Sequence, residues 1–285
     1  MSAMLNEKDD TLYRRVTRRG LNIGGTVMSK GIVISLYDYT GEAVMPWAEA
    51  GYECYCFDIQ HDDTLAYLAG DGGIIFFEHA DLHSRETIEA IIERFEDQGV
   101  VFLSAFPVCT DMAVSGAAHF KRKAEADPQF QTKAAMYARW CADVGEALGC
   151  PYFVENPVSV LATLWRKPDH SFHPYQYGGY IPEDKAEHPK WPEYIPARDA
   201  YKKKTCLWTG GGFLMPIKSE VDCSAYYGNG YSKPMMKLGG MSMKTKNIRS
   251  ATPRGFALAV FKTNSRDLYC RITSPRTSIV EEEWK

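Results

Sequence analysis

Short apolar strands alternate with amphipathic helices along most of the chain. Runs rich in β-branched or aromatic residues predict buried strands at residues 32–36, 53–57, 74–77, 100–105 and 151–154, with a strand-like piece at 205–215. Apolar residues at helical spacing predict helices at 43–50, 84–96, about 132–148 and 253–261. Such alternation is typical of a mostly parallel sheet covered on both faces. We therefore predict a doubly wound α/β fold that binds ligands at the carboxyl ends of its strands.

The same pattern divides the chain into four parts. Residues 1–30 carry arginines but little apolar periodicity, which indicates a loosely ordered basic arm. Residues 31–215 form the main α/β domain, within which 168–200 lacks periodicity and is expected to run over the surface. Residues 216–248 are a small, irregular, basic segment. Residues 249–285 contain a helix that returns to the main domain, followed by a tail.

Composition is that of an ordinary globular protein, with 45% hydrophobic and 24% charged residues among 285. No apolar run reaches the roughly 20 residues of a membrane span, and the N-terminus lacks a signal-peptide pattern, so we expect a cytoplasmic protein without a membrane partner. The eight cysteines show no paired CxxC spacing and are expected to be reduced. His79 and His83 have no third ligand at a recognised distance, so no metal is expected.

Charge is distributed unevenly along the chain. The formal net charge is −3, yet residues 200–285 hold 15 lysines and arginines against 6 acidic residues, a balance of +9. A basic surface of this kind suits a polyanionic partner such as nucleic acid, although solvated surface charge explains such an asymmetry about as often.

Polar residues follow three successive predicted strands. The turn at residues 37–41 lies between a strand and a helix, where backbone amides can receive an anionic or zwitterionic ligand. Asp58 ends the second strand and could accept hydrogen bonds from ribose hydroxyls, and Asp81 after the third could pair with an adenine amino group. Each alone is more often a plain turn residue. Together they favour a nucleoside site.

A thiol and a carboxyl group follow the next two strands. Cys109 comes after the fourth strand and Glu155 ends the fifth, so a parallel sheet brings both to one edge. Transfer of a one-carbon group to a pyrimidine ring needs such a pair, because a thiolate must add to carbon 6 while an acid near nitrogen 3 stabilises the charge that reaches carbon 5. The alternative is a buried structural cysteine.

In these residues the chain resembles the DNA (cytosine-5) methyltransferases, as a short member of the phage or bacterial type. The resemblance runs in the family's order from Ile32 to Phe261. Its motifs are similar to residues 36–41 (LYDYTG), 57–59 (FDI), 81–82 (DL), 106–110 (FPVCT), 155–157 (ENP), 201–208 (YKKKTCLW) and 249–257 (RSATPRGFA).

The resemblance implies a Rossmann-like fold, S-adenosylmethionine as cofactor, and methyl transfer to carbon 5 of a cytosine flipped out of DNA in a bacterial or phage-infected cell. It makes residues 31–215 the catalytic domain and 216–248 the target-recognition segment. Cys109 would be the nucleophile and Glu155 would hold the base, with Lys203 or Lys204 at the pyrimidine carbonyl. The implied cofactor-binding residues are Tyr37, Asp38, Tyr39, Thr40, Gly41, Asp58, Ile59, Asp81, Leu82, Pro107 and Ser250. The implied DNA-binding residues are Ser115, Lys121, Arg122, Asn156 and Thr205, the first three on a mobile loop at 110–123.

The chain departs from the family pattern at several points. Ser35 stands where an aspartate is usual, Tyr39 where a glycine is usual, and the segment that reads DNA is very short. These departures leave two alternatives. The enzyme could act on a free cytosine nucleotide or transfer a modified one-carbon group, or the chain could be a catalytically silent DNA-binding relative.

Overall fold

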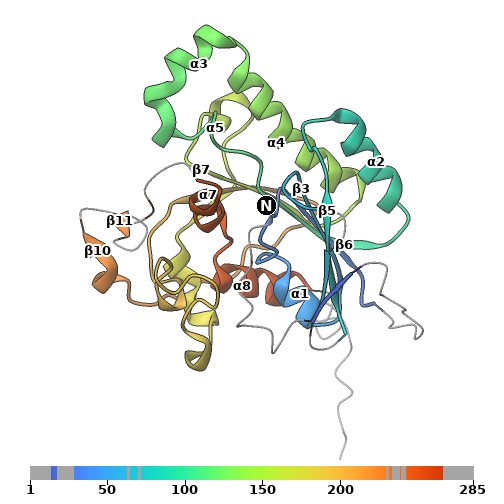
Figure 1. Ribbon diagram of the computed structural model, residues 1–285, viewed down its shortest axis with the longest axis vertical. Coiled ribbons are helices and arrows are strands. Elements are labelled where there is room, and N and C mark those ends of the chain that lie inside the picture. Colours follow the sequence, from blue (N-terminus) through green and yellow to red (C-terminus); the bar gives the residue numbers. More distant parts are fainter. Residues whose placement is uncertain are drawn as a thin grey trace, which may run out of the picture.

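One sheet of nine strands forms the centre of the molecule (Figure 1). The computed structural model describes residues 14–17, 29–62, 65–69, 72–228, 231–232, 238 and 242–265. In chain order the strands of the sheet are β1 (Arg14–Thr17), β2 (Ile32–Leu36), β3 (Glu53–Asp58), β4 (Leu65–Leu68), β5 (Ile74–His79), β6 (Val100–Ala105), β7 (Tyr152–Pro157), β8 (His170–Phe172) and β9 (Thr205–Gly210).

The centre of this sheet is parallel and its edges are antiparallel. Across the sheet the order is β1-β4-β5-β3-β2-β6-β7-β9-β8. The five strands from β5 to β7 run parallel, whereas β4 pairs antiparallel with β5, and β9 pairs antiparallel with both β7 and β8. Because the order reverses on either side of β2, the ends of β2 and β6 flank a crevice of the kind where α/β folds bind ligands.

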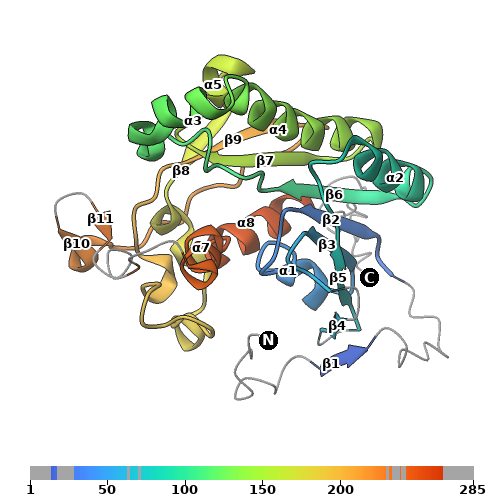
Figure 2. The ribbon, with the colours of Figure 1, turned by 45° about the horizontal axis from the view of Figure 1, so that its top comes forward.

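Helices cover both faces of the sheet (Figure 2). One face carries α2 and α4, and the other carries α1 and α8. The α-helices are α1 (Met45–Glu49), α2 (Arg85–Phe95), α3 (Phe120–Ala126), α4 (Phe130–Ala147), α5 (Leu161–Leu164), α7 (Met243–Ser250) and α8 (Arg254–Asn264). The short 3-10 helices are η2 (Val114–His119), η3 (Pro174–Tyr180), η4 (Glu183–Lys185), η5 (Ala197–Asp199) and η6 (Ser224–Tyr226). The expected doubly wound, mostly parallel, Rossmann-like α/β fold is confirmed.

A separate hydrophobic core lies under each helical layer. Ile88 and Phe95 of α2 are fully buried in the first core. In the second, Trp47 of α1 stacks on Phe102 of β6 with ring centroids 5.0 Å apart, and Phe256 of α8 belongs to the same cluster. Alternate residues of the central strands therefore face opposite cores, which explains why these strands read as nearly continuous apolar runs.

The predicted elements from residue 31 onward are confirmed, but several short ones were not predicted. These are β1, β4, β8, α3, α5 and α7. Within the arm expected at 1–30, residues 14–17 form β1 and pair with β4, so the expectation of a loosely ordered arm is wrong for them. The rest of that arm up to residue 28 and the tail after 265 lie outside the described residues.

The segment at 168–200 runs over the surface only in part, with exposed residues around 182–193 and buried residues before them. Phe172 and Tyr177 are 2% and 0% exposed, and Phe172 stacks on Phe256 of α8 at 4.0 Å. The backbone of α8 also approaches this segment closely, because a Cβ atom at Gly255 would lie 2.4 Å from the carbonyl oxygen of Tyr177. Phe172 and Tyr177 are thus core residues beneath α8.

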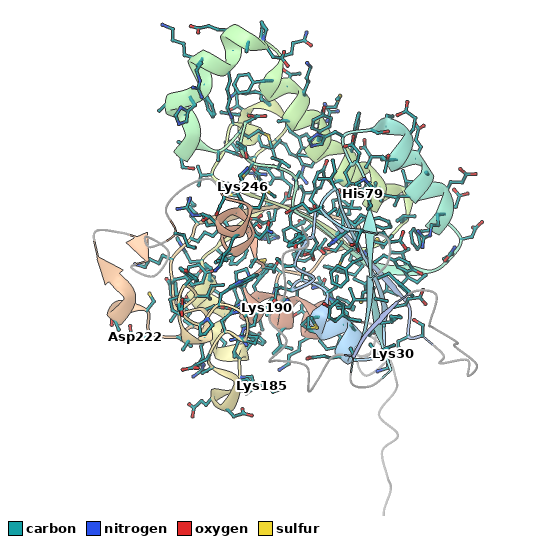
Figure 3. The ribbon with its side chains drawn as sticks, in the orientation of Figure 1. Lys30, His79, Lys185, Lys190, Asp222 and Lys246 are labelled. Atoms are coloured by element: carbon teal, nitrogen blue, oxygen red, sulfur yellow. The ribbon has the colours of Figure 1, made fainter. Side chains whose placement is uncertain are left out.

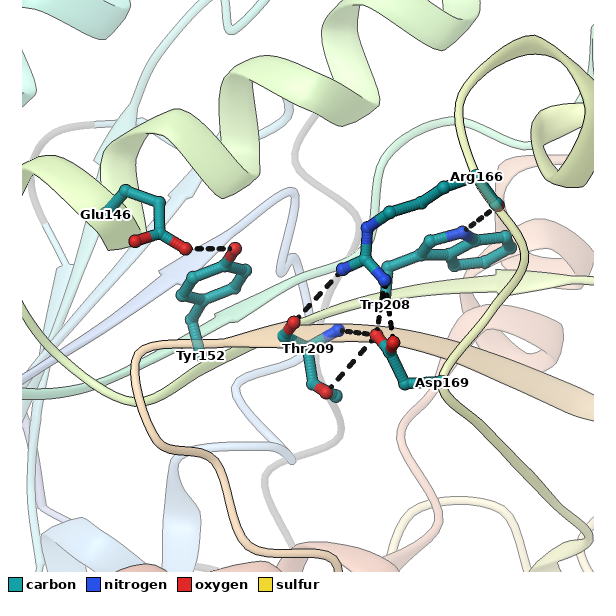
Figure 4. Close-up of polar contacts among 6 residues, drawn as sticks. All are labelled: Glu146, Tyr152, Arg166, Asp169, Trp208 and Thr209. Carbon is teal, nitrogen blue, oxygen red and sulfur yellow. Dashed lines mark hydrogen bonds and ion pairs between the residues drawn. The ribbon is translucent and has the colours of Figure 1, made fainter.

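Polar contacts fix the start of this inserted segment to the far end of β9 (Figure 4). Arg166 donates to both carboxylate oxygens of Asp169 at 2.7 and 2.6 Å and to the carbonyl of Thr209 at 3.0 Å. Asp169 in turn accepts from the Thr209 amide at 2.7 Å, and the Trp208 indole donates to the Arg166 carbonyl at 2.6 Å. The connection from α5 to β8 is therefore held at the Thr209 end of β9, which is the end away from Thr205.

The segment at 216–248 is described only in part. It contains η6, a two-stranded antiparallel sheet of β10 (Tyr227–Gly228) and β11 (Tyr231–Ser232), and α7 up to residue 248. Among the residues that the structure describes, no helix combines the length and apolar character needed to cross a membrane.

Candidate functional site

The turn after β2 begins with a strained residue. Tyr37 has a φ of 57°, in the left-handed region that a tyrosine rarely adopts. Its hydroxyl donates to the carbonyl oxygen of Leu82 at 2.9 Å. This bond joins the end of β2 to the loop after β5, so two of the predicted cofactor-binding stretches are physically connected. Strain of this kind persists where surrounding contacts enforce it and is concentrated at functional sites.

Asp38 shapes the turn from within and does not point outward as a ligand-binding carboxylate would. It is 3% exposed, and its carboxylate accepts from the amides of Thr40 and Gly41 at 3.1 and 2.8 Å and from the Ser35 hydroxyl at 2.9 Å. Burial raises its pKa, and these hydrogen bonds oppose the rise. Ser35 also bonds Ser104 of β6 at 2.9 Å. The Asp38 side chain therefore holds the turn together, and cofactor binding at this position stays a prediction.

The next residues of the turn are held from the other side. The ring of Tyr39 stacks on His61 with centroids 5.4 Å apart, and His61 Nε2 lies 3.0 Å from the carbonyl oxygen of Asp38. Gly41 has a φ of 70°, and a Cβ there would lie 2.9 Å from the Phe77 ring. The large residue at 39 is thus accommodated by a specific partner, and position 41 requires glycine.

The acidic residues at the ends of β3 and β5 lie where the sequence predicted. Asp58 is buried, and its Oδ1 accepts from the Gln60 amide at 2.8 Å and the Gln60 side chain at 3.2 Å. Asp81 is exposed and bonds the amide of His83 at 3.0 Å. Ile59 is 60% exposed, whereas the Leu82 side chain is buried. Any contact of Leu82 with a cofactor would therefore have to come from its backbone.

Cys109 lies at the root of the loop after β6. It is partly exposed, and its carbonyl oxygen accepts from the amides of Met112 and Ala113 at 2.9 and 2.8 Å, which closes a tight turn around the thiol. Burial of the thiol raises its pKa, the charge of Glu155 raises it further, and the charge of Lys203 opposes both effects. These mutual effects mean that the three side chains share one electrostatic environment.

Glu155, near the end of β7, has a buried carboxyl oxygen that is available for a hydrogen bond. Its Oε1 has no hydrogen-bond partner among the described residues. Burial raises the Glu155 pKa, and Lys203 partly offsets that rise. A buried carboxyl group with a raised pKa and a free oxygen is suited to hold a proton and donate it to a bound molecule.

Asn156 connects this strand end to the nucleophile loop. Its side chain is fully buried, and its Nδ2 donates to the carbonyl oxygen of buried Pro107 at 3.1 Å. The chain segments continue side by side, because Val114 and Val158 are joined by a backbone bond of 3.0 Å. Asn156 and Pro107 therefore fix the position of Cys109 relative to Glu155.

A small cleft opens beside these residues. Four predicted site residues meet in its wall, from β7, the start of β9 and the end of α7. The inserted segment and α8 add aromatic residues that sequence reasoning missed. The lining residues are Phe106, Glu155, Phe172, Lys203, Thr205, Ser250, Ala251, Thr252, Pro253 and Phe256. The cleft thus joins the strand edge predicted for the base to the closing motif predicted for the cofactor.

The two candidate lysines differ in position. Lys203 lines the cleft and donates to the carbonyl oxygen of Arg249 at 2.9 Å. Lys204 is exposed, and its charge acts on His173 and Cys206. Of the two alternatives, the geometry favours Lys203 as the residue beside Glu155. Thr205 is buried and bonds the Lys203 carbonyl at 3.2 Å, which supports that lysine from behind.

Three of the five residues predicted to contact DNA lie on the segment after the nucleophile, whereas Asn156 and Thr205 are buried. Ser115 is exposed on η2, and Lys121 and Arg122 are exposed on α3. Lys123 points back instead, donating to the carbonyl of Thr110 at 3.0 Å. The region expected to be a loop is therefore partly helical and carries its free cations outward. No group of three metal-ligating side chains occurs within the described part of the chain.

Comparisons with known proteins add little to this geometry. No family model matches the chain, and no curated protein matches it. A crystal structure from E. coli, described provisionally as a DNA modification methyltransferase encoded within a prophage, aligns with a TM-score of 0.34 at 13% identity. The alignment covers 63% of this chain and 46% of that one, so the chain spans less than half of that protein's length. A likeness this weak identifies neither a family nor an activity.

Proposed function

We propose that the protein transfers a methyl group from S-adenosylmethionine to carbon 5 of cytosine in DNA through a covalent adduct with Cys109. The observation that supports this most is that Cys109 and Glu155 belong to the ends of the adjacent parallel strands β6 and β7, with Lys203, just before β9, lining the cleft beside Glu155 and acting on both groups. A nucleophile, a proton-holding acid and a fixed cation are the groups that a pyrimidine needs for addition at carbon 6.

The residues around the turn fit a nucleoside-containing methyl donor. The positive φ of Tyr37 and of Gly41 shapes a tight turn at the end of β2, and Gly41 lets that turn pack closely against Phe77 of β5. The Oδ2 atom of Asp58 accepts no hydrogen bond from the described residues, which leaves it for ribose hydroxyls. Pro107, Ser250 and Asp81 stand around the same edge. When bound there, S-adenosylmethionine would supply an electrophilic methyl group.

The residues of the chain account for the remaining steps. The Cys109 thiolate forms a bond to carbon 6, and the electrons of the 5,6 double bond move toward carbon 5. Glu155 donates a proton at ring nitrogen 3, and Lys203 stabilises the neighbouring carbonyl. After carbon 5 has gained the methyl group it loses its proton to water. The sulfur–carbon bond then breaks and the proton on nitrogen 3 returns to Glu155, which restores the aromatic ring, the thiolate and the protonated carboxyl group.

DNA as the acceptor is supported by charge and exposure. Lys121 and Arg122 project from α3 beyond the nucleophile loop, and residues 200–285 carry a charge balance of +9. Phosphate contact by such cations is independent of sequence and weakens with salt. The base would leave the helix to reach the cleft, because stacking blocks its ring faces in a duplex.

Capture on DNA that contains 5-fluorocytosine tests this proposal, since fluorine at carbon 5 prevents release of the adduct. We expect wild type plus S-adenosylmethionine to form a denaturation-resistant complex, and Cys109→Ser to bind the DNA without forming it. Tritium from labelled cofactor should appear in polymeric DNA as 5-methylcytosine. Label found only in free nucleotides would assign another acceptor, and DNA binding without cofactor binding or adduct would indicate a silent relative.

A further inference from the structure

Three distant parts of the chain meet beside the proposed cofactor turn. The turn itself continues into Glu42, whose side chain is only 5% exposed. The inserted segment at 168–200 approaches it with Lys190, and α8 contributes Arg254 at its first residue. Both cations, together with buried His188, act on the charge of Glu42. Sequence analysis assigned no role to Glu42, His188 or Lys190.

Lys190 makes the direct contacts. Its Nζ lies 3.0 Å from Oε1 of Glu42 and donates to the carbonyl oxygen of Thr40 at 3.3 Å. Figure 3 shows Lys190 where the inserted segment faces the beginnings of α1 and α8, whereas Lys185 lies toward the outer end of that segment. One ammonium group therefore holds both a backbone oxygen within the turn and the carboxylate that follows it.

The segment that carries Lys190 is itself held firmly. His188 accepts from the amides of Lys190 and Trp191 at 3.2 Å through its Nδ1. Arg254 donates to the carbonyl of Ala186 at 3.0 Å, and Asp199 accepts from the Gly255 amide at 2.9 Å. The segment that carries Lys190 is thus bonded to α8 on both sides of the lysine. The position of the ammonium group therefore does not depend on an isolated loop.

Electrostatics favour a charged pair here. Burial raises the pKa of Glu42, but Lys190, His188 and Arg254 outweigh that effect, and the net pKa is lowered. For Lys190 burial lowers the pKa, and the attraction of Glu42 outweighs it. Loss of the lysine would therefore remove the ion pair of Glu42 and leave a buried carboxylate directly after the turn, opposed only by the charges of His188 and Arg254.

We infer that Lys190 is a positioning residue for cofactor binding, through which the inserted segment holds the 38–42 turn in its binding conformation. The inference rests on the proposed function for the identity of what the turn binds. It assigns to residues 168–200 a task in the site in addition to their packing under α8. Lys190 acts through Glu42 and Thr40 and takes no part in the chemical step.

Two measurements on Lys190→Met test the inference, with Lys185→Met as a matched control in the same segment and Lys190→Arg as the conservative variant. Hydrogen exchange without cofactor reports on the turn itself, because the amides of Thr40 and Gly41 are bonded to Asp38. We expect faster exchange in peptides covering 38–42 for Lys190→Met alone. Calorimetric titration with S-adenosylmethionine should show a Kd raised about tenfold, with partial rescue by arginine and an unchanged kcat at saturating cofactor.

The outcomes separate this inference from the proposed function. Unchanged exchange at 38–42 in Lys190→Met would overturn the inference whether or not the protein binds S-adenosylmethionine. An unchanged Kd in a wild type that binds the cofactor would do the same. If wild type binds no cofactor but the exchange effect is present, the proposed function fails while the contact between segment and turn stands. A lower Tm with unaltered exchange and Kd would reduce Lys190 to a merely structural role.

Discussion

Replacing Glu155 by glutamine separates the chemical role of this carboxyl group from its effect on stability. The two side chains have the same size, so the packing at the end of β7 is kept while the charge disappears. In wild type, burial raises the Glu155 pKa and Lys203 offsets only part of the rise, so the ionised form weakens the folded state. An unsatisfied buried polar group costs about 1–3 kcal/mol. We expect the free energy of unfolding of Glu155→Gln at pH 8 to exceed that of wild type by about 1 kcal/mol. The gain stays this small because the amide removes the charge but still leaves an unpaired polar atom.

The difference in free energy of unfolding between Glu155→Gln and wild type must depend on pH in a defined direction. The folded-state pKa of Glu155 lies above the ordinary value of 4.5. Below the unfolded-state pKa the carboxyl group is protonated in both states, so its ionisation costs nothing there. The penalty develops as the pH rises from the unfolded-state pKa to the raised folded-state pKa and stays constant at higher pH. The stability of wild type relative to Glu155→Gln should therefore fall between pH 4 and pH 8.

Urea unfolding of both proteins at pH 4 and pH 8 measures this difference, which corresponds to about 2–4 °C in Tm for a domain of this size. Glu125→Gln serves as control, because Glu125 is exposed on α3 and should show no comparable pH dependence. In the same preparations, methyl transfer by Glu155→Gln should fall by at least about 100-fold. Equal stability differences at the two pH values, or full activity in the glutamine variant, would refute the reasoning.

Three further predictions concern the turn and the nucleophile loop. Gly41→Ala should lower stability by about 1–3 kcal/mol and weaken cofactor binding, because of its positive φ and the nearby Phe77 ring; an unchanged Tm would contradict this. Asn156→Ala removes the 3.1 Å bond to Pro107 and should slow single-turnover adduct formation by about 10- to 100-fold, with DNA affinity retained; equal rates would exclude a positioning role. Since burial and Glu155 raise the Cys109 pKa above its ordinary 9.0, capture on fluorinated DNA should accelerate from pH 7 to pH 9, and a rate that is flat over this range would disprove the shift.

The parallel centre of the sheet could be predicted because its strands carry their own signal. Residues 32–36 and 100–105 are apolar on both sides, as a strand between two helical layers must be. The four-residue strand β4 offers too few positions for such a signal, and it exists because β5 pairs with it. Helix α7 is largely polar and is short, so its apolar side could not be recognised, although Ser242 caps it through the Thr245 amide at 3.2 Å.

Site positions were more predictable than side-chain directions. Parallel strands end at one edge, so Cys109 and Glu155 had to be neighbours once their strands were recognised. The inward direction of the Asp38 side chain was not predicted, although the partners that hold it lie within three residues along the chain. The contact between Lys190 and Thr40 joins residues 150 positions apart. Such a pair depends on the packing of the whole inserted segment and has no sequence signature.

The position of α8 in the chain has a consequence for how the protein is made. This helix covers the second core, yet residues 254–264 leave the ribosome after every strand of the nine-stranded sheet. Until then Trp47, Phe102 and Phe172 belong to an apolar face that lacks its cover. The nascent chain would therefore complete one side of the sheet early and expose the other, which makes it a candidate for chaperone binding until α8 has emerged.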